Sequence, residues 1–244
     1  MDTTLDKKYE LKIDKFTTII DKDNYIMPKN ISKQGFGIGV NYKETPKGLK
    51  LEFSSKLFST PTSLNALKLS NCNEFSDKIY VQTQIIINND YLINSAEIHR
   101  VDVFEDIFVD DIPSYYLSEI KEILKGKSDK FDVYKYSDLS YIHGLTVIPK
   151  ANKKWKVSIY TKGRELMKSR NKKYREIFNS EFLEETEHII RFEYQIRNFE
   201  DMRIEFGIPK TRYLSGQLKK PTIKDIFINC RRNVVADLFD KLVA

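Results

Sequence analysis

Residues 156–166, which read KVSIYTKGREL, contain the side chains best suited to chemistry. Tyr160 and Lys162 are two residues apart, so on a strand they share one face, while Val157 and Ile159 face the other way. A phenol is a poor nucleophile at neutral pH because its pKa is about 10. A nearby cation, either a lysine or a metal ion, favours the phenolate. The segment therefore predicts a strand that presents an activatable tyrosine.

Two further alternating stretches carry carboxylates on a polar strand face. The acids are Asp102 and Asp106 in residues 96–107 and Glu193 in residues 187–198. Carboxylates without histidine or cysteine suit a hard divalent ion, and such an ion offsets charge that develops on a phosphodiester. We therefore expect Mg²⁺ or Mn²⁺ as the cofactor, with these acids as candidate ligands. Plainer interpretations stay open: a packing tyrosine, aspartates that are solvated or paired with a neighbouring arginine, and a surface cross-strand pair.

The net charge of +6 is unevenly distributed along the 244 residues. Residues 150–175 hold eleven Lys or Arg and one acid, whereas residues 97–122 hold eight acids and two cations. A concentrated basic block favours a polyanionic partner, with nucleic acid as the first candidate, although a solvated lysine-rich loop has the same composition. Arginine suits phosphate because its guanidinium binds two oxygens at once. The nucleic-acid-binding candidates are Arg100, Lys153, Lys154, Lys156, Arg164, Arg191 and Arg197.

Strand patterns outnumber helix patterns along the chain, and turns join them. This predicts an α+β fold in which helices pack on one face of an antiparallel sheet. We expect one domain over residues 1–220, with its core at about 35–200. Residues 221–244 are expected to form a C-terminal helix, capped by Thr222 and running to about Leu242, that packs on this domain.

Local patterns predict particular elements within that sheet. Residues 34–42 alternate as a strand and form a hairpin with residues 48–53 across a Pro-Lys-Gly turn. A short helix is expected near residues 63–69, and an amphipathic helix over 113–124. Residues 74–93 are compatible with either strand or helix.

Composition also restricts the compartment. No apolar run approaches the roughly 18 residues of a membrane helix, so no membrane partner is expected. The N-terminus has no signal-peptide core. Cys72 and Cys230 lie far apart and fit no metal spacing, which favours a reducing cytoplasm.

Four motifs, taken in order, resemble the replication initiators of filamentous phages, the gene II/gene X family, and related proteins of single-stranded DNA phages and plasmids. The motifs are GLKLEFSSKLF, HRVDVFEDI, KVSIYTKGREL and IIRFEYQIRN, and together they span about residues 48–200. The resemblance implies a sheet related to the HUH nuclease fold. It also implies an enzyme that nicks an origin strand, holds the 5′ phosphate on tyrosine and releases a 3′ hydroxyl for a polymerase. The chain has no His-x-His pair, so the implied metal site must be built from carboxylates.

The resemblance assigns roles to residues of this sequence. It implies Tyr160 as the nucleophile, Lys162 and Arg191 as phosphate contacts, Glu165 as the residue that orients Lys162, and Asp102, Asp106 and Glu193 as metal ligands. The implied partner is single-stranded or origin DNA in a host bacterial cytoplasm. Host replication proteins and a second copy of the chain, as a homodimer, are further partners to test.

Two other functions remain open at this point. The chain could be a non-catalytic DNA-binding regulator of replication on the same scaffold, or a metal-dependent nuclease that uses water. Tyr136 or Tyr141 would replace Tyr160 as the nucleophile if the strand register differed.

Overall fold

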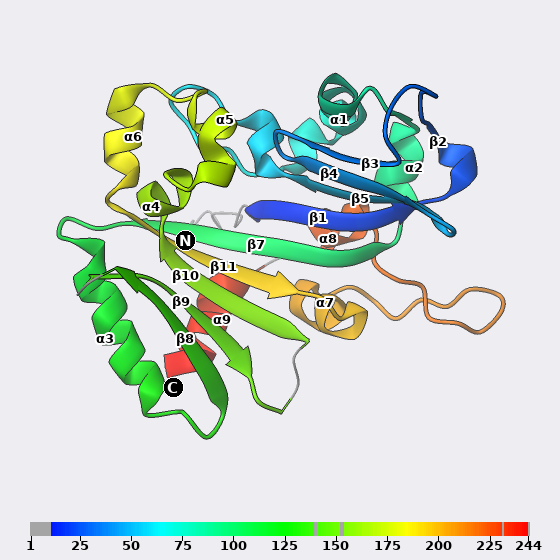
Figure 1. Ribbon diagram of the computed structural model, residues 1–244. Helices are drawn as coiled ribbons and strands as arrows, with labels where there is room; N and C mark the ends of the chain where they lie inside the picture. Colours follow the sequence, from blue (N-terminus) through cyan, green and yellow to red (C-terminus); the bar gives the residue numbers. More distant parts are fainter. Residues whose placement is uncertain (1–10, 139–140, 152–153, 231, 244) are drawn as a thin grey trace, which may run out of the picture.

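The computed structural model describes residues 11–138, 141–151, 154–230 and 232–243 and is organised around one large antiparallel sheet (Figure 1). Nine strands pair in the order β3-β4-β5-β1-β7-β11-β10-β9-β8. The predicted α+β class is therefore confirmed. The strands are β1 (Ile13–Ile20), β3 (Gln34–Gly37), β4 (Val40–Thr45), β5 (Gly48–Ser54), β7 (Ile98–Phe108), β8 (Phe131–Asp138), β9 (Tyr141–Pro149), β10 (Trp155–Thr161) and β11 (Ile189–Ile196), with β2 (Tyr25–Ile26) and β6 (Ile86–Ile87) as a separate pair.

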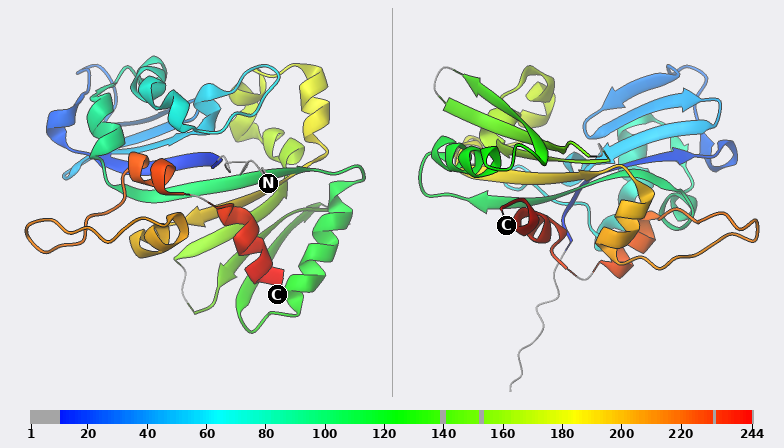
Figure 2. Two further views of the ribbon diagram at one scale, coloured as in Figure 1. Left: turned by 180° about the vertical axis from the view of Figure 1, so that it is seen from behind. Right: turned by 90° about the horizontal axis from the view of Figure 1, so that it is seen from below.

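Helices cover the apolar face of the sheet and one end of its polar face. The helices are α1 (Phe75–Thr83), α2 (Asn89–Asn94), α3 (Pro113–Lys125), α4 (Lys162–Leu166), α5 (Lys172–Arg175), α6 (Ser180–Thr186), α7 (Phe199–Phe206), α8 (Ile223–Asn229) and α9 (Val234–Val243). Figure 2 shows both outer parts of the sheet, β3–β5 and β8–β9, curving toward one side, with α7, α8 and α9 on the other. None of the described helices is long and apolar enough to cross a membrane.

Alternation within each strand separates an apolar face from a polar one. Val157 and Ile159 of β10 are buried, as predicted. Aromatic rings join this face to the helices: Phe53 to Phe75 of α1, Phe16 to Phe227 of α8, and Phe192 to Phe239 of α9. This one-sided burial leaves the opposite face of the same strands free to carry polar groups.

Strand β1 joins the two halves of the sheet. It pairs with β5 on one side and with β7 on the other. The core predicted at 35–200 leaves this strand out, although Ile13, Phe16 and Ile20 are all fully buried. The first strand among the described residues is therefore a central strand.

Several local predictions are corrected by the structure. Residues 34–42 form two strands, because Gly39, with φ of +74°, turns the chain between β3 and β4. The predicted helix at 63–69 does not form: Leu67 N donates to Ile13 O in an isolated bridge to β1, and a 3₁₀ helix starts only at Leu69. The predicted C-terminal helix is two helices, α8 and α9, because Asn233 caps a second start by accepting from Ala236 N.

The remaining local predictions hold. The turn before Gly48 joins β4 to β5, with Thr45 paired to Gly48. Helix α3 follows the predicted range closely. The ambiguous stretch 74–93 holds α1, β6 and α2 in turn.

Candidate active site

The pairing of β10 with β11 brings the predicted tyrosine and glutamate together on the polar face. Tyr160 lies opposite Arg191, and Ser158 lies opposite Glu193. Tyr160 and Glu193 are therefore diagonal neighbours, within reach of long side chains. The Tyr160 hydroxyl donates a hydrogen bond of 2.8 Å to Glu193 Oε2.

The phenol of Tyr160 is strongly held in its protonated form. Burial and the adjacent charge of Glu193 raise its pKa well above the ordinary value, and the nearby charge of Arg191 opposes this shift. At neutral pH the hydroxyl is therefore a hydrogen-bond donor. Its use as a nucleophile requires a group that takes the proton.

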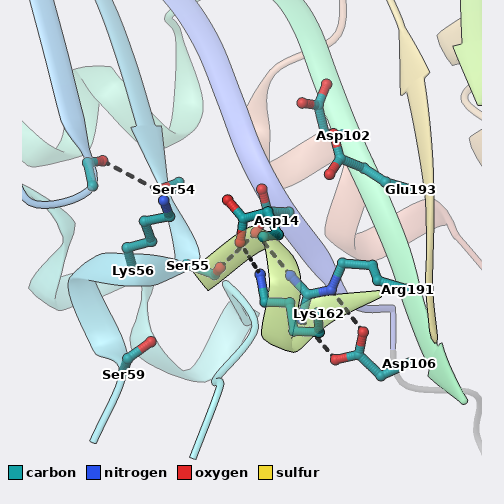
Figure 3. Close-up of polar contacts among 12 residues, drawn as sticks. Asp14, Ser54, Ser55, Lys56, Ser59, Asp102, Asp106, Lys162, Arg191 and Glu193 are labelled. Atoms are coloured by element: carbon teal, nitrogen blue, oxygen red, sulfur yellow. Dashed lines mark hydrogen bonds and ion pairs between the residues drawn. The ribbon is translucent and has the colours of Figure 1, made fainter. Parts of the chain in front are cut away.

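Glu193 is the group placed to take that proton. Burial and the negative charges of Asp102 and Asp14 raise its pKa to about 7. Asp102 is fully buried, and burial raises its pKa too, although Arg100 donates to both its carboxylate oxygens. Figure 3 shows the carboxylates of Asp14, Asp102 and Glu193, from β1, β7 and β11, on the same side of the sheet. Burial, together with the repulsion among these carboxylates, therefore holds the pKa of Glu193 at about 7.

Asp106 is engaged by Arg191. The guanidinium Nε and Nη2 donate to its two oxygens, each at 2.6 Å, while Nη1 donates to Asp14 at 3.4 Å (Figure 3). The guanidinium carbon lies 3.9 Å from the ring centroid of Phe104. Arg191 is 2% exposed, so it is a buried link between β1, β7 and β11. The metal-ligand role of Asp106 and the phosphate contact of Arg191 stay predictions.

Lys162 is the first residue of α4 and not the end of a strand. Its Nζ lies 3.1 Å from Glu165 Oε2, one turn later, and 5.9 Å from the ring centroid of Tyr160. Burial alone would raise the pKa of Glu165, but Lys162 and Lys56 lower it to about 2. An ionised Glu165 thus holds the Lys162 ammonium beside the tyrosine ring.

A groove of about 1940 Å³ runs over these residues. Tyr160, Lys162, Glu165 and Glu193 all line it. Its lining contains eleven lysines or arginines and five acids, so it carries a positive excess. Seven of the eleven cations in residues 150–175 belong to this lining: Lys156, Lys162, Arg164, Lys168, Arg170, Lys172 and Lys173. Most of the basic block therefore lies along one side of the groove, where Arg164, Lys168, Arg170, Lys172 and Lys173 are exposed.

The other predicted nucleic-acid contacts are dispersed. Arg100 lines the groove but is paired with Asp102 and with Glu52. Lys154 is exposed. Arg197 is exposed too, and its Nε donates to Gln195 Oε1. Lys153 lies outside the described residues.

Sequence patterns missed four residues that form hydrogen bonds around the site, namely Asp14, Ser55, Lys56 and Asn171. Asp14 lies at a break in the pairing of β1 with β7, where the register shifts between Ile13 and Lys15. Alternation fails at such a bulge, so the strand and its acid were not recognised. The others come from loops or short helical turns: Ser55 donates to Asp14 at 2.7 Å, Lys56 donates to Asn171 at 2.8 Å, and Asn171 donates to Glu165 at 2.7 Å.

The donor atoms fit a hard cation in their chemistry, since Asp14, Asp102 and Glu193 offer only oxygen. Their arrangement is that of an ion-pair network, because Arg100 and Arg191 already engage the acids of β7. Among the residues that the structure describes, no group of three His, Cys, Asp or Glu is arranged to hold a metal ion. The predicted Mg²⁺ or Mn²⁺ therefore remains a prediction.

Comparison with known proteins gives little beyond this geometry. No protein-family model and no curated protein matches the chain. A solved structure similar to it is the rolling circle replication initiator protein from Geobacillus stearothermophilus. The TM-score is 0.39 and the identity is 13%, over 96% of this chain and 98% of that one. A likeness at this level carries no argument, so the function is argued from the residues themselves.

Proposed function

We propose that this protein is a rolling-circle replication initiator that nicks and rejoins single-stranded origin DNA through a covalent phosphotyrosine at Tyr160. The observation that carries the proposal is the hydrogen bond from the Tyr160 hydroxyl to Glu193 on the floor of a groove lined mainly by cations. A phenol, a carboxylate that can take its proton and positive charge for a phosphate are the groups that this transfer needs.

The reaction exchanges one phosphodiester bond for another. Tyr160 Oη forms a bond to phosphorus, the bond from phosphorus to the 3′ oxygen breaks, and the 5′ phosphate stays on the tyrosine. The phenol proton passes to Glu193 Oε2, which already accepts its hydrogen bond. The leaving 3′ oxygen takes up a proton from water and becomes the free hydroxyl. Arg191 is the nearby cation whose charge lowers the pKa of the phenol, and Lys162 Nζ lies 5.9 Å from the ring centroid.

A divalent cation belongs to the proposal as well. Asp102, Asp106 and Glu193 would hold Mg²⁺ or Mn²⁺ only if the arginine pairs of the two aspartates opened, because Arg100 and Arg191 engage both oxygens of each. When bound, the ion would polarise a phosphate oxygen and offset the charge that develops in transfer.

The direct test is adduct formation in the presence of Mn²⁺. The protein is incubated with single-stranded origin DNA of its own replicon and resolved under denaturing conditions. We expect a covalent protein–DNA species for the natural chain and none for Tyr160→Phe, because only the phenol oxygen is removed. Binding of the same strand, measured without metal, should be unchanged in Tyr160→Phe. Cleavage without an adduct that survives Tyr160→Phe would indicate a nuclease that uses water.

A second candidate is a non-catalytic DNA-binding regulator of replication. The raised pKa of Tyr160 favours it, because a phenol held protonated by burial and by Glu193 is inert. This function predicts salt-sensitive DNA binding with no adduct under any metal condition. Host replication proteins and a second copy of the chain stay predicted partners for either function.

A further inference from the structure

We propose that Tyr136, across the bare backbone of Gly144 from Tyr160, forms a slot that stacks the DNA base next to the phosphate to be transferred. The proposal rests on the proposed function and adds a binding subsite to it. Its occupant is a base of single-stranded DNA.

Strand register places the three residues in one row. Tyr136 of β8 pairs with Gly144 of β9, and Gly144 pairs with Tyr160 of β10. Residues in one such row point to the same face of a sheet. The two tyrosines are two strand spacings apart, about 9–10 Å along the sheet. All three residues line the large groove.

Gly144 leaves the space between the tyrosines empty. A Cβ added at Gly144 would lie 3.1 Å from Tyr160 Cβ, tighter than ordinary packing. Any larger residue would therefore crowd Tyr160 and fill the slot. A flat base midway between the rings would lie about 5 Å from each, within the range of aromatic stacking.

The ring of Tyr136 is available for this contact. It is 59% exposed, and Tyr134, two residues earlier on the same face, is 52% exposed. In the described part of the chain, neither ring packs against another aromatic ring. Exposed aromatic rings on a sheet surface are the platforms on which single-stranded nucleic acid stacks its bases.

Positive charge continues from the groove along these tyrosines. A second hollow of about 420 Å³ is lined by Tyr134, Tyr136 and Trp155 with the cations Lys156 and Arg197. Tyr136 and Lys156 line both hollows, so one track connects them. Cations for phosphates, interleaved with rings for bases, complement a single strand and argue for that occupant.

The test compares binding to a strand with bases and to one without. The probes are an oligodeoxythymidylate of about 12 nucleotides, within the usual site size, and an abasic strand of equal length. Fluorescence anisotropy is measured without metal, so that strand transfer plays no part. Tyr136→Ala should weaken binding to the thymidylate by about 5- to 140-fold, the range of one stacked base. It should leave binding to the abasic strand unchanged.

Two further variants separate stacking from other effects. Tyr136→Phe keeps the ring and should restore affinity for the thymidylate. Tyr115→Ala removes an equally exposed tyrosine, 56% exposed, from α3 on the far face and should change neither affinity. Because β8 is an edge strand, the oligomeric state of each variant is measured as well.

Three results would overturn the slot: an unchanged affinity of Tyr136→Ala for the thymidylate, an equal loss on both strands, or a loss on the thymidylate that accompanies a change of oligomeric state. Failure of the proposed function would look different. It would leave the affinity difference between the two strands in place while the natural chain formed no adduct.

Discussion

Arg191 shows how the polar face is stabilised at the level of single side chains. It is buried, and it is the cation that Asp106 and Asp14 share. Removing one partner of a buried ion pair leaves the other charge without compensation, at a cost of about 3–5 kcal/mol. We therefore expect Arg191→Met to lower the free energy of unfolding by about that amount in urea. Arg197→Met, at an exposed site just after the same strand, should change it by no more than about 0.5 kcal/mol. Similar small effects for both would refute the network.

Glu193 predicts a pH dependence whose sign follows from its shift. Its pKa is raised from 4.5 to about 7 by burial, Asp102 and Asp14, while Tyr160 and Lys15 partly oppose the shift. The stability linked to this group is present below pH 4.5 and is lost as pH rises through about 7. The loss is at most about 3 kcal/mol, since one pKa unit is worth about 1.4 kcal/mol.

Glu193→Gln tests this linkage because it removes the titration and keeps an oxygen for the Tyr160 hydroxyl. Urea denaturation at pH 5 and pH 8, with a chelator present, should find the variant more stable relative to the natural chain at the higher pH. A stability difference that does not change between these pH values would disprove the shift.

At the scale of elements, the sequence predicted the strands in which every second residue is apolar and buried. Residues 156–161 alternate over a buried apolar face, and so do most of β7 and β11, which is why Tyr160 and Glu193 could each be assigned to a polar strand face in advance. The pattern failed where backbone geometry overrides it. Gly39 breaks one predicted strand into a hairpin, and the bulge near Asp14 hides a central one.

Alternation within a strand does not show which other strand it pairs with. Arg191 is on the predicted face, but its two hydrogen bonds to Asp106 depend on the pairing of β11 with β7. Lys162 was expected on a strand, yet the chain turns into α4 there because α4 packs over β11 and α6. Partners that are set by strand order cannot be read from one strand's sequence.

The hairpin of β4 and β5 gives the sharpest prediction at this scale. Gly48 has φ of +132°, and a Cβ there would lie 2.2 Å from the Ile20 carbonyl oxygen. Gly48→Ala should therefore cost at least about 1–3 kcal/mol of unfolding free energy, because strained backbone and a backbone clash both resist it. Gly126→Ala, whose added Cβ meets nothing closer than 3.4 Å, should cost less than about 0.5 kcal/mol. Thermal melts of the two variants decide this, and equal melting temperatures would contradict the turn geometry.

For the whole molecule, the placement of charge predicts which face meets nucleic acid. Lys172 and Lys173 line the groove, whereas Lys121 and Lys125 lie on α3 at the apolar face of the sheet. Replacing both groove lysines with glutamine should reduce the salt dependence of single-stranded DNA binding by about 0.7 in log–log slope for each phosphate that is no longer neutralised. Replacing both α3 lysines in the same way should leave the slope unchanged. A larger reduction of the slope from the α3 pair would show that DNA binds on the other side of the sheet.

The central claim is that the oxygen of Tyr160 receives the phosphate, and mapping the modified residue tests it most directly. The protein–DNA adduct formed with Mn²⁺ is digested with nuclease and protease and analysed by mass spectrometry. We predict that the nucleotide remnant is found on the peptide that carries Tyr160. A remnant on Tyr136 or Tyr141, or strand binding at full affinity with no adduct at all, would contradict the account.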